Sequence, residues 1–564
     1  MNTELIGVLA IIVLSITFAY PLGKYISKVF KEEKIWSDFL LPVEKLIFKL
    51  SGIDTKVQMD WKENVRAMLR INTVFYVWGI SILMIQGYIP LLNPTKAHSM
   101  EPTLAFNTAI SFVTNTNLQH YSGETGLSYF SQLFVIGFLQ FVTAATGIAV
   151  LALLFNGINN KKNGKIGNFY SLFVKSCTRI LLPISLVVSI IILLNGTPAT
   201  LNGNQKVITL EGDTCYVSTG PVAPIVAIKQ IGTNGGGFFG TNSAHPFENP
   251  NYFTNAIENI SILLIPIALV FTFGFTTNNK KLAWVFWGVM TIMFFVFVSV
   301  AINFESTSNH ELTKLGISQP IGNTEGKEIR IGSYASALWG VSTTSTSNGS
   351  VNSMHDSVMP LTGGVYMLDM MINSIYGGVG VGFINFFMFV IIAVFISGLM
   401  VGRTPEFLGK KIEIKEVKIA SLIILLHPLL ILVGAAISTY IITKNSQLAY
   451  LNNSSFHGFS EMLYEFVSAA ANNGSGFEGL GDNTPFWNIA TGIVMLLGRY
   501  IPIIGPMAII GSLSAKKTIP YSEGTLKVDS IAFGVVLIGV IIVVAALSFF
   551  PALSLGPIAE YFTL

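Results

Sequence analysis

The sequence predicts an all-α membrane protein that crosses the bilayer ten times. Hydrophobic residues make up 51% of its 564 residues and charged residues only 11%, whereas a soluble domain carries roughly 25% charged residues. Ten apolar stretches are each long enough to cross a hydrocarbon core about 30 Å thick. Four similar polar tripeptides lie at nearly equal spacing between pairs of these stretches, which indicates four repeated units around one centre.

The charge balance and the motif content exclude several classes of protein. Lys and Arg total 33 against 30 Asp and Glu, which is too balanced for a protein that binds nucleic acid through its phosphates. The two cysteines cannot form a disulfide framework. The chain has neither a GxxxxGK[ST] loop nor a DKTG-like phosphorylation motif. We therefore expect no organic cofactor and no enzymatic activity of this chain on its own.

The ten predicted spans are apolar stretches separated by polar loops. They lie at residues 5–25, 67–91, 130–156, 172–195, 256–276, 282–304, 364–401, 417–443, 486–512 and 529–551. The stretch at 364–401 contains a glycine-rich interruption at 377–382. Because glycine weakens a helix, the stretch is predicted to be one broken helix, with two short helices as the alternative.

Basic residues predict the orientation of the chain in the membrane. They gather in every second loop, at residues 24–70, 161–165, 280–281, 403–418 and 516–527. Loops rich in Lys and Arg stay in the cytoplasm. Since the number of spans is even, both termini are then expected outside the cytoplasm.

Each of the four long loops on the other side contains one of the tripeptides. They are Asn115-Thr116-Asn117, Thr233-Asn234-Gly235, Ser347-Asn348-Gly349 and Asn472-Asn473-Gly474. Their third residues are between 114 and 125 residues apart, and a short apolar stretch precedes each tripeptide. Each unit therefore reads as a helix, a half-buried apolar helix, a polar turn and a second helix.

The repeated turn has a physical use beyond reversing the chain. A half-helix that ends inside a membrane leaves carbonyl groups unpaired, and these survive only when buried in protein or beside water. Four such turns around an axis present oxygens that can replace the hydration shell of a cation. The simpler interpretation is that each tripeptide is only a polar loop. The equal spacing and the common side of all four favour a cation site.

Longer strings of residues carry a resemblance to one known family. They are Gly232–Gly240 (GTNGGGFFG), Asn242–Pro250 (NSAHPFENP), Asn352–Ser357 (NSMHDS), Gly377–Gly380 (GGVG), Gly402–Lys411 (GRTPEFLGKK) and Ala470–Ser475 (AANNGS). The chain resembles, over nearly its whole length, the A subunits (KdpA) of the Kdp potassium pump, an ATP-driven uptake complex of bacteria. The resemblance implies four fused helix–pore loop–helix units, with one helix before them and one after.

The resemblance also implies a potassium selectivity filter built from backbone carbonyls of the four tripeptides. The implied filter residues are Asn115, Thr116, Asn117, Thr233, Asn234, Gly235, Ser347, Asn348, Gly349, Asn472, Asn473 and Gly474. Gln119 and Gly232 are the expected supporting residues. The third residue is glycine in three units and Asn117 in the first. Asn tolerates a left-handed backbone better than most residues, so the same turn is expected there.

The glycines at the interruption, namely Gly377, Gly378, Gly380 and Gly382, have two interpretations. They either let helices pack closely or form a flexible gate below the filter. The resemblance favours the gate, because this family uses the inner helix of its third unit to control passage toward a side tunnel. That tunnel leads to the ATP-hydrolysing subunit.

Two charged residues near the predicted centre, Arg499 and Asp369, also have more than one interpretation. Arg499 lies well inside a span, where a charge indicates function by default. It limits leak or shapes the ion path, or else it snorkels to the membrane surface or forms a structural ion pair with a residue such as Glu258 or Asp369. Asp369 either attracts cations or caps a local turn.

Taken together, the sequence predicts a potassium-binding and translocating subunit of a bacterial plasma membrane complex. The resemblance implies a KdpB-like P-type ATPase partner and small KdpC-like and KdpF-like subunits, with lipid around the spans. The competing function is an autonomous Trk/Ktr-like potassium channel or gradient-driven transporter. The expected segments are 1–62 (first helix and cytoplasmic loop), 63–160, 161–278, 279–414 and 415–515 (four pore units), and 516–564 (last helix).

Overall fold

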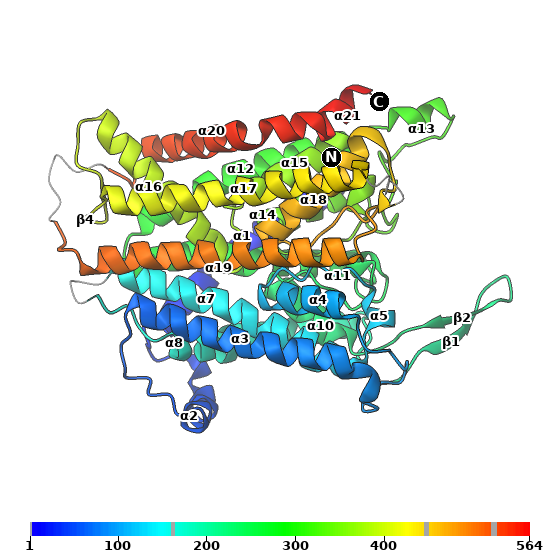
Figure 1. The fold of residues 1–564 in the computed structure, drawn as a ribbon, viewed down its shortest axis with the longest axis horizontal. Helices are drawn as coiled ribbons and strands as arrows, with labels where there is room; N and C mark the ends of the chain where they lie inside the picture. Colours follow the sequence, from blue (N-terminus) through cyan, green and yellow to red (C-terminus); the bar gives the residue numbers. More distant parts are fainter. Residues whose placement is uncertain (1–2, 160–163, 445–449, 520–526, 564) are drawn as a thin grey trace.

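The computed structural model describes residues 3–159, 164–444, 450–519 and 527–563. Parts of two predicted basic loops, 161–163 and 520–526, lie outside the described residues. Within them, ten helices are long and apolar enough to cross a membrane. Most of these helices run along the longest axis of the molecule (Figure 1). The predicted all-α polytopic fold is therefore confirmed.

Nine of the ten spans coincide with predicted stretches to within a few residues, and the other covers only residues 381–400 of the stretch predicted at 364–401. The ten spans are α1 (Thr3–Phe30), α3 with a final 3-10 turn η2 (Trp61–Tyr88), α6, η3 and α7 (Tyr129–Asn159), α8, η4 and α9 (Phe169–Leu194), α11 (Tyr252–Thr276), α12 (Lys280–Glu305), α16 (Val381–Met400), α17 (Ile414–Lys444), α19 (Pro485–Ala515) and α20 (Ile531–Leu555). The third and fourth each contain a π-helical turn, η3 (Gln132–Gly137) and η4 (Ser176–Leu181).

The stretch predicted at 364–401 is two helices. α15 (Pro360–Ile372) has 13 residues, so it is about 20 Å long and shorter than the bilayer core. A non-helical segment at 373–380 then leads into α16. Asn373, Gly377 and Gly380 in this segment have φ values of +46°, +62° and +84°. These left-handed residues cannot continue an α-helix, which is why the helix stops.

Four short helices lie inside the protein, one in each predicted unit. They are α4 (Pro102–Val113), α10 (Val222–Ile231), α14 (Ser333–Ser345) and α18 (Ser455–Ala471). We call them the pore helices. Each stands in sequence between two spans, with α1 before the four units and α20 after them. This is the predicted repeat of helix, half-buried helix, turn and helix.

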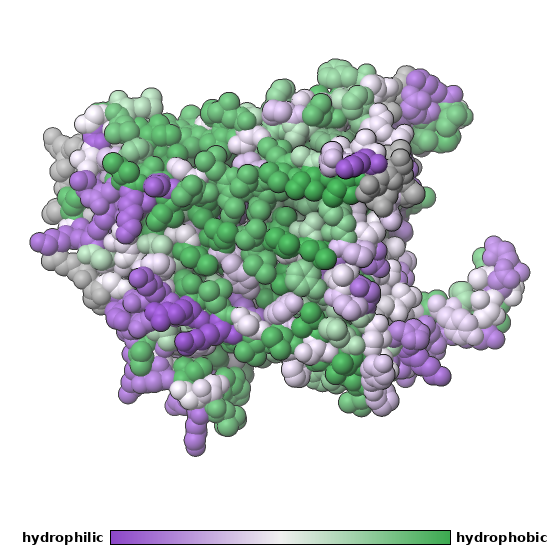
Figure 2. All heavy atoms as spheres, viewed as in Figure 1, coloured by the Kyte–Doolittle hydropathy of each residue, from purple (hydrophilic) through white to green (hydrophobic). Residues whose placement is uncertain are grey.

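Burial separates central from peripheral spans. The most apolar window of the third span is 89% buried, whereas those of α1, the second span and α20 are each 28% buried. The exposed residues of these outer helices are largely apolar, and hydrophobic side chains cover the middle of the face in Figure 2. A lipid environment is as apolar as such side chains, so this surface suits a membrane.

The polar residues gather at the two ends of the long axis (Figure 2). The chain termini lie at the same end as the antiparallel hairpin of β1 (Gln205–Ile208) and β2 (Thr214–Val217), which projects from the body (Figure 1). The remaining short elements are η1 (Trp36–Leu40), α2 (Leu41–Leu50), α5 (Gly123–Gly126), η5 (Asn242–Ala244), α13 (His310–Lys314), η6 (His355–Ser357), β3 (Glu406–Phe407), β4 (Lys410–Lys411) and α21 (Pro557–Thr563).

Candidate functional site: a ring of four turns

The four tripeptides directly follow the C-terminal ends of the four pore helices. In each unit the middle residue donates its backbone N–H to the carbonyl five residues earlier, at 2.9 Å in all four. The pairs are Thr116 to Ser111, Asn234 to Lys229, Asn348 to Thr343 and Asn473 to Ser468. One hydrogen bond therefore defines the same turn four times, although the residues differ.

The backbone of each tripeptide alternates in handedness. The first and third residues have φ between +44° and +102°, while the middle residue has an ordinary negative φ. Glycine occupies the third position in three units, where positive φ costs it little. Asn117 takes the same conformation at +57°, which confirms the expectation that asparagine can replace glycine at this turn.

The turns touch one another and close into a ring. A Cβ atom added to the glycine of one unit would overlap the carbonyl of the next unit. Three contacts of this kind link consecutive units: Gly235 with Asn348, Gly349 with Asn473, and Gly474 with Thr116. The fourth link is a hydrogen bond of 3.0 Å from Asn115 Nδ2 to the carbonyl of Thr233. The order of the units around the ring is therefore their order in the sequence.

Side-chain amides of the ring bond to the surrounding scaffold. Asn234 Nδ2 donates to Asn115 Oδ1 at 2.6 Å, and Asn115 Oδ1 also accepts from Thr143 on α7 at 2.9 Å. Asn472 Nδ2 donates to the carbonyl of Met495 on α19 at 3.0 Å. The twelve ring residues are buried except Gly474, which is half-buried. The amides thus fix the turns from outside the ring.

The two expected supporting residues contact the second unit. Gln119 pairs with the backbone of Gly237: its Oε1 accepts from the N–H at 2.9 Å, and its Nε2 donates to the carbonyl at 3.2 Å. Gly232 ends α10, and its carbonyl accepts from Asn115 Nδ2 at 3.3 Å. The first and second units are therefore joined on both sides of the second turn.

The non-helical segment 373–380 is bonded to the ring. Val379 N–H donates to Thr233 Oγ1 at 2.9 Å, and Gly377 N–H donates to the carbonyl of Ser345 at 2.7 Å. Gly380 approaches the backbone of Gly147 on α7 so closely that neither residue has space for a Cβ atom. Gly377 and Gly382 also lie so close together that neither residue has space for a Cβ atom. The segment is held by backbone contacts that only glycine permits.

Asp369, on α15, points to the end of the third pore helix. Its Oδ2 accepts from Thr344 Oγ1 at 2.8 Å and from Ser345 Oγ at 2.5 Å. The two donors are side-chain hydroxyl groups, so the carboxyl group ties α15 to the end of α14; the attraction of cations by Asp369 stays a prediction. The carboxyl group holds the last turn of α14 directly before the tripeptide.

Arg499, on α19, is 4% exposed and lies beside Gly147 and Gly378. Among the residues that the structure describes, it forms no ion pair. Glu258, one expected partner, instead accepts from Gln230 and Ser243. The guanidinium therefore lies next to the 373–380 segment without a neutralising carboxylate.

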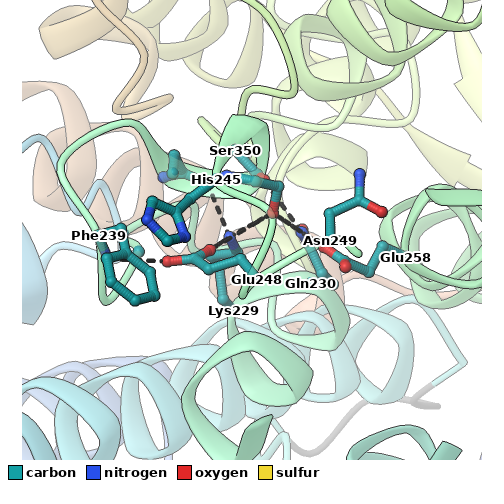
Figure 3. Close-up of polar contacts among 12 residues, drawn as sticks. Lys229, Gln230, Phe239, His245, Glu248, Asn249, Glu258 and Ser350 are labelled. Carbon is teal, nitrogen blue, oxygen red and sulfur yellow. Dashed lines mark hydrogen bonds and ion pairs between the residues drawn. The ribbon is translucent and has the colours of Figure 1, made fainter. Parts of the chain in front are cut away.

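The sequence reasoning missed a second buried cation. Lys229 lies in α10 and its side chain is fully buried in an ion pair with Glu248 (Figure 3). Its ammonium also donates to Asn242 Oδ1 at 2.7 Å and Ser243 Oγ at 2.6 Å. The detectable signal is a lysine inside the apolar stretch that precedes the second tripeptide. Glu248 also ties the outer loop together, because its carboxylate accepts from Phe239 N–H at 2.9 Å.

A buried histidine links the first and fourth units just beyond the ring. His120 Nε2 lies 3.1 Å from Glu465 Oε1 and 3.9 Å from Asp482 Oδ2, and its Nδ1 lies 2.7 Å from Asn488 Oδ1. Burial alone would lower the pKa of His120. The charge of Asp482 and the hydrogen bond to Glu465 outweigh burial and raise this pKa to about 9. The imidazole is therefore a cation at neutral pH.

Comparisons with known proteins confirm the family resemblance that the motifs carry. The family model described as "Potassium-transporting ATPase A subunit" matches residues 9–562. A protein of Phocaeicola vulgatus is 56% identical over the full length of both chains, and one of Flavobacterium psychrophilum is 55% identical over the full length. A protein of Geobacillus kaustophilus is 49% identical over 98% of each chain. All three are named potassium-transporting ATPase potassium-binding subunit.

The fold also matches a solved structure of lower sequence similarity. The potassium transporter TrkH from Vibrio parahaemolyticus superposes with a TM-score of 0.51 at 14% identity, covering 89% of this chain and 98% of that one. At this identity the match concerns the fold alone.

The raised pKa of His120 predicts a pH-dependent stability. The charged imidazole contributes fully below the unfolded value of about 6.5 and loses its contribution as pH rises through about 9. We expect the melting temperature of the purified protein to fall across this window. His120→Gln should be less stable at pH 6 and should flatten the slope. His98→Gln, at an exposed histidine, is the control; equal slopes in both variants would contradict the assignment.

Proposed function

Because the chain belongs to the family of potassium-transporting ATPase A subunits, we propose that it binds potassium from outside the cell at the ring of four turns. The ion sheds its water there and then passes sideways to a P-type ATPase partner. ATP is hydrolysed by that partner, and this chain performs no covalent chemistry. The transported cargo is K⁺.

The closed ring is the observation that carries this proposal. Four backbone turns of one geometry, linked unit to unit, offer carbonyl oxygens at a common place. Carbonyl rings of this kind replace the hydration shell of potassium. The four pore helices also direct their C-terminal ends, which carry partial negative charge, toward the ring. Both features favour a cation without placing a formal negative charge there.

We assign the gate to residues 377–382, which contain Gly377, Gly378 and Gly380 of the non-helical segment and Gly382 at the start of α16. Its bonds to Thr233 and Ser345 are single hydrogen bonds, and its glycines permit backbone changes that other residues resist. Movement of this segment would therefore directly displace the backbone of the second turn and the end of the pore helix that precedes the third. A cavity beside it, lined by Asn373, Asn385 and Gly498 among others, supports a sideways path between α16, α17, α19 and α20.

Arg499 fits a role in limiting leak. It is a buried guanidinium beside the gate segment, and in the described part of the chain no carboxylate is paired with it. A positive charge below a cation site raises the barrier to an ion that would continue straight through. The ion is thereby favoured to leave by the side.

The complete pump is proposed to contain a KdpB-like ATPase and small KdpC-like and KdpF-like subunits, in a bacterial plasma membrane. Both termini lie at the end of the molecule that carries the long loops (Figure 1). We place this end outside the cell, because the basic loops lie at the other end.

A second candidate function is an autonomous potassium transporter of the Trk/Ktr kind. The observation that favours it is the shared fold with a potassium transporter at a TM-score of 0.51. The two functions differ in whether the chain works with an ATPase.

The ring predicts a specific effect of a single methyl group. Gly349 has φ +84°, and a Cβ atom there would overlap Asn473 of the next unit. Gly349→Ala should therefore displace a ring carbonyl and raise the half-saturating K⁺ concentration by about tenfold or more, since left-handed strain costs about 1–3 kcal/mol. The matched control is Gly539→Ala on α20, where the space is open. Unchanged K⁺ affinity in a properly assembled Gly349→Ala protein would contradict the filter.

Purification separates the two candidate functions. Extracted from its native membrane in mild detergent, the chain should bring with it a P-type ATPase subunit and show K⁺-stimulated ATP hydrolysis. Recovery of the chain alone, with potassium uptake into liposomes that needs no ATP, would favour the autonomous transporter.

Removing the buried guanidinium should increase leak. In Arg499→Gln proteoliposomes without ATP, we expect passive K⁺ flux to rise by about tenfold, the equivalent of about 1.4 kcal/mol in a barrier. ATP-driven uptake should fall because ions escape. Arg70→Gln, at an exposed arginine on α3, is the control. Wild-type flux and coupling in Arg499→Gln would leave the charge with a local structural role only.

A further inference from the structure

One position behind the ring breaks its four-fold pattern. The residue whose carbonyl accepts the common 2.9 Å hydrogen bond is Ser111, Thr343 and Ser468 in the first, third and fourth units. In the second unit it is Lys229. Three small hydroxyl side chains and one ammonium group therefore occupy equivalent places at the ends of the pore helices.

The hydroxyl groups at two of these places bond to their own turns. Ser111 Oγ donates to the carbonyl of Leu118 at 2.9 Å, and Ser468 Oγ accepts from Gly474 N–H at 3.0 Å. The side chain at this position thus holds the third residue of the tripeptide or the chain that follows it. Lys229 is too long for this local bond, and its ammonium reaches the loop that follows the second turn.

All three donors of the ammonium are used within that loop. They bond to Asn242 Oδ1, Ser243 Oγ and the Glu248 carboxylate. Lys229 and Glu248 are both fully buried, so their charges compensate one another away from water. Figure 3 shows Lys229, Gln230, Glu248 and Glu258 gathered in this network.

Asn242 connects the ammonium to the ring. Its Oδ1 faces Lys229, and its Nδ2 donates to the carbonyl of Gly235 at 2.5 Å. Ser350, next to the third turn, adds a bond of 3.1 Å to the same Oδ1. Asn242 has a left-handed backbone, φ +54°, a conformation that asparagine tolerates better than most residues.

We propose that Lys229 is a positioning residue that orients the Gly235 carbonyl through Asn242 and thereby sets the ion discrimination of the ring. This inference rests on the proposed filter function. Lys229 makes the second unit chemically distinct. The Gly235 carbonyl accepts a hydrogen bond from the Asn242 amide, and the strength of that bond depends on the buried charge of Lys229. K⁺ and the slightly larger Rb⁺ should then respond differently to the loss of Lys229.

The test removes the ion pair as a unit. Lys229→Met/Glu248→Gln removes both charges of the pair together, and neutral replacements of a buried pair are often tolerated. Glu258, also buried in this network, keeps its bonds from Gln230 and Ser243. We expect the complex to assemble and its ratio of half-saturating Rb⁺ to K⁺ concentrations to change by about tenfold, the size of one buried hydrogen bond. Asn242→Ala should produce the same change. Adding it to the double variant should change the ratio no further, because both act through one contact.

The matched control is a second buried ion pair in the outer part of the protein. Lys327 and Glu305 lie 2.7 Å apart and are 2% and 0% exposed. Lys327→Met/Glu305→Gln should keep the wild-type ion ratio. An equal shift in this control would overturn the proposal, since any lost ion pair would then suffice.

The remaining outcomes of this experiment also test the role of Lys229. A wild-type ratio in Lys229→Met/Glu248→Gln, or effects that add when Asn242→Ala is combined with it, would overturn the role of Lys229. If the double variant does not assemble, Asn242→Ala alone decides, and a wild-type ratio there overturns the proposal. Gly349→Ala is measured alongside: its normal K⁺ affinity would refute the filter itself, whereas a shift in Gly349→Ala alone would refute only the positioning by Lys229.

Discussion

Unpaired backbone carbonyls at membrane depth are the constraint on which the rest of this structure depends. Four pore helices end inside the protein, and each leaves carbonyl groups without helical partners. Lipid cannot satisfy such groups, so they must be enclosed by protein or meet a polar ligand. The surrounding spans supply the enclosure: the third span is buried along most of its length, while the outer helices present apolar side chains. The proposed ion supplies the missing ligand.

The four turns share a backbone and differ in what holds it. The common hydrogen bond and the alternating φ values repeat in every unit. The groups behind the turns do not repeat: a carboxyl group accepts from hydroxyl groups at the end of α14, an ammonium lies behind the second turn, and the inner helix of the third unit is broken. Symmetric backbone suits the recognition of a spherical ion. Unequal surroundings suit a path that leaves the ring in one direction.

Prediction succeeded where a signal is local along the chain. Apolar runs predicted all ten spans, and the small polar tripeptides predicted where the pore helices end. The tolerance of asparagine for left-handed backbone anticipated the turn at Asn117. Prediction failed for Lys229, because a single charge in a loop and a single charge behind a filter look alike in one dimension. It also left Arg499 with expected partners, Glu258 and Asp369, that bond elsewhere.

The sequence by itself therefore determined the membrane class, the four-fold repeat and the family, because hydropathy, periodic spacing and long motifs are properties of the chain alone. Only the tertiary structure decided that the turns close into one ring, that 364–401 is two helices, and which groups face the buried charges. These features depend on contacts between residues more than a hundred positions apart, such as Thr233 with Val379 and Asn115 with Thr233. Their free energies arise only after the helices have packed, so no local pattern records them.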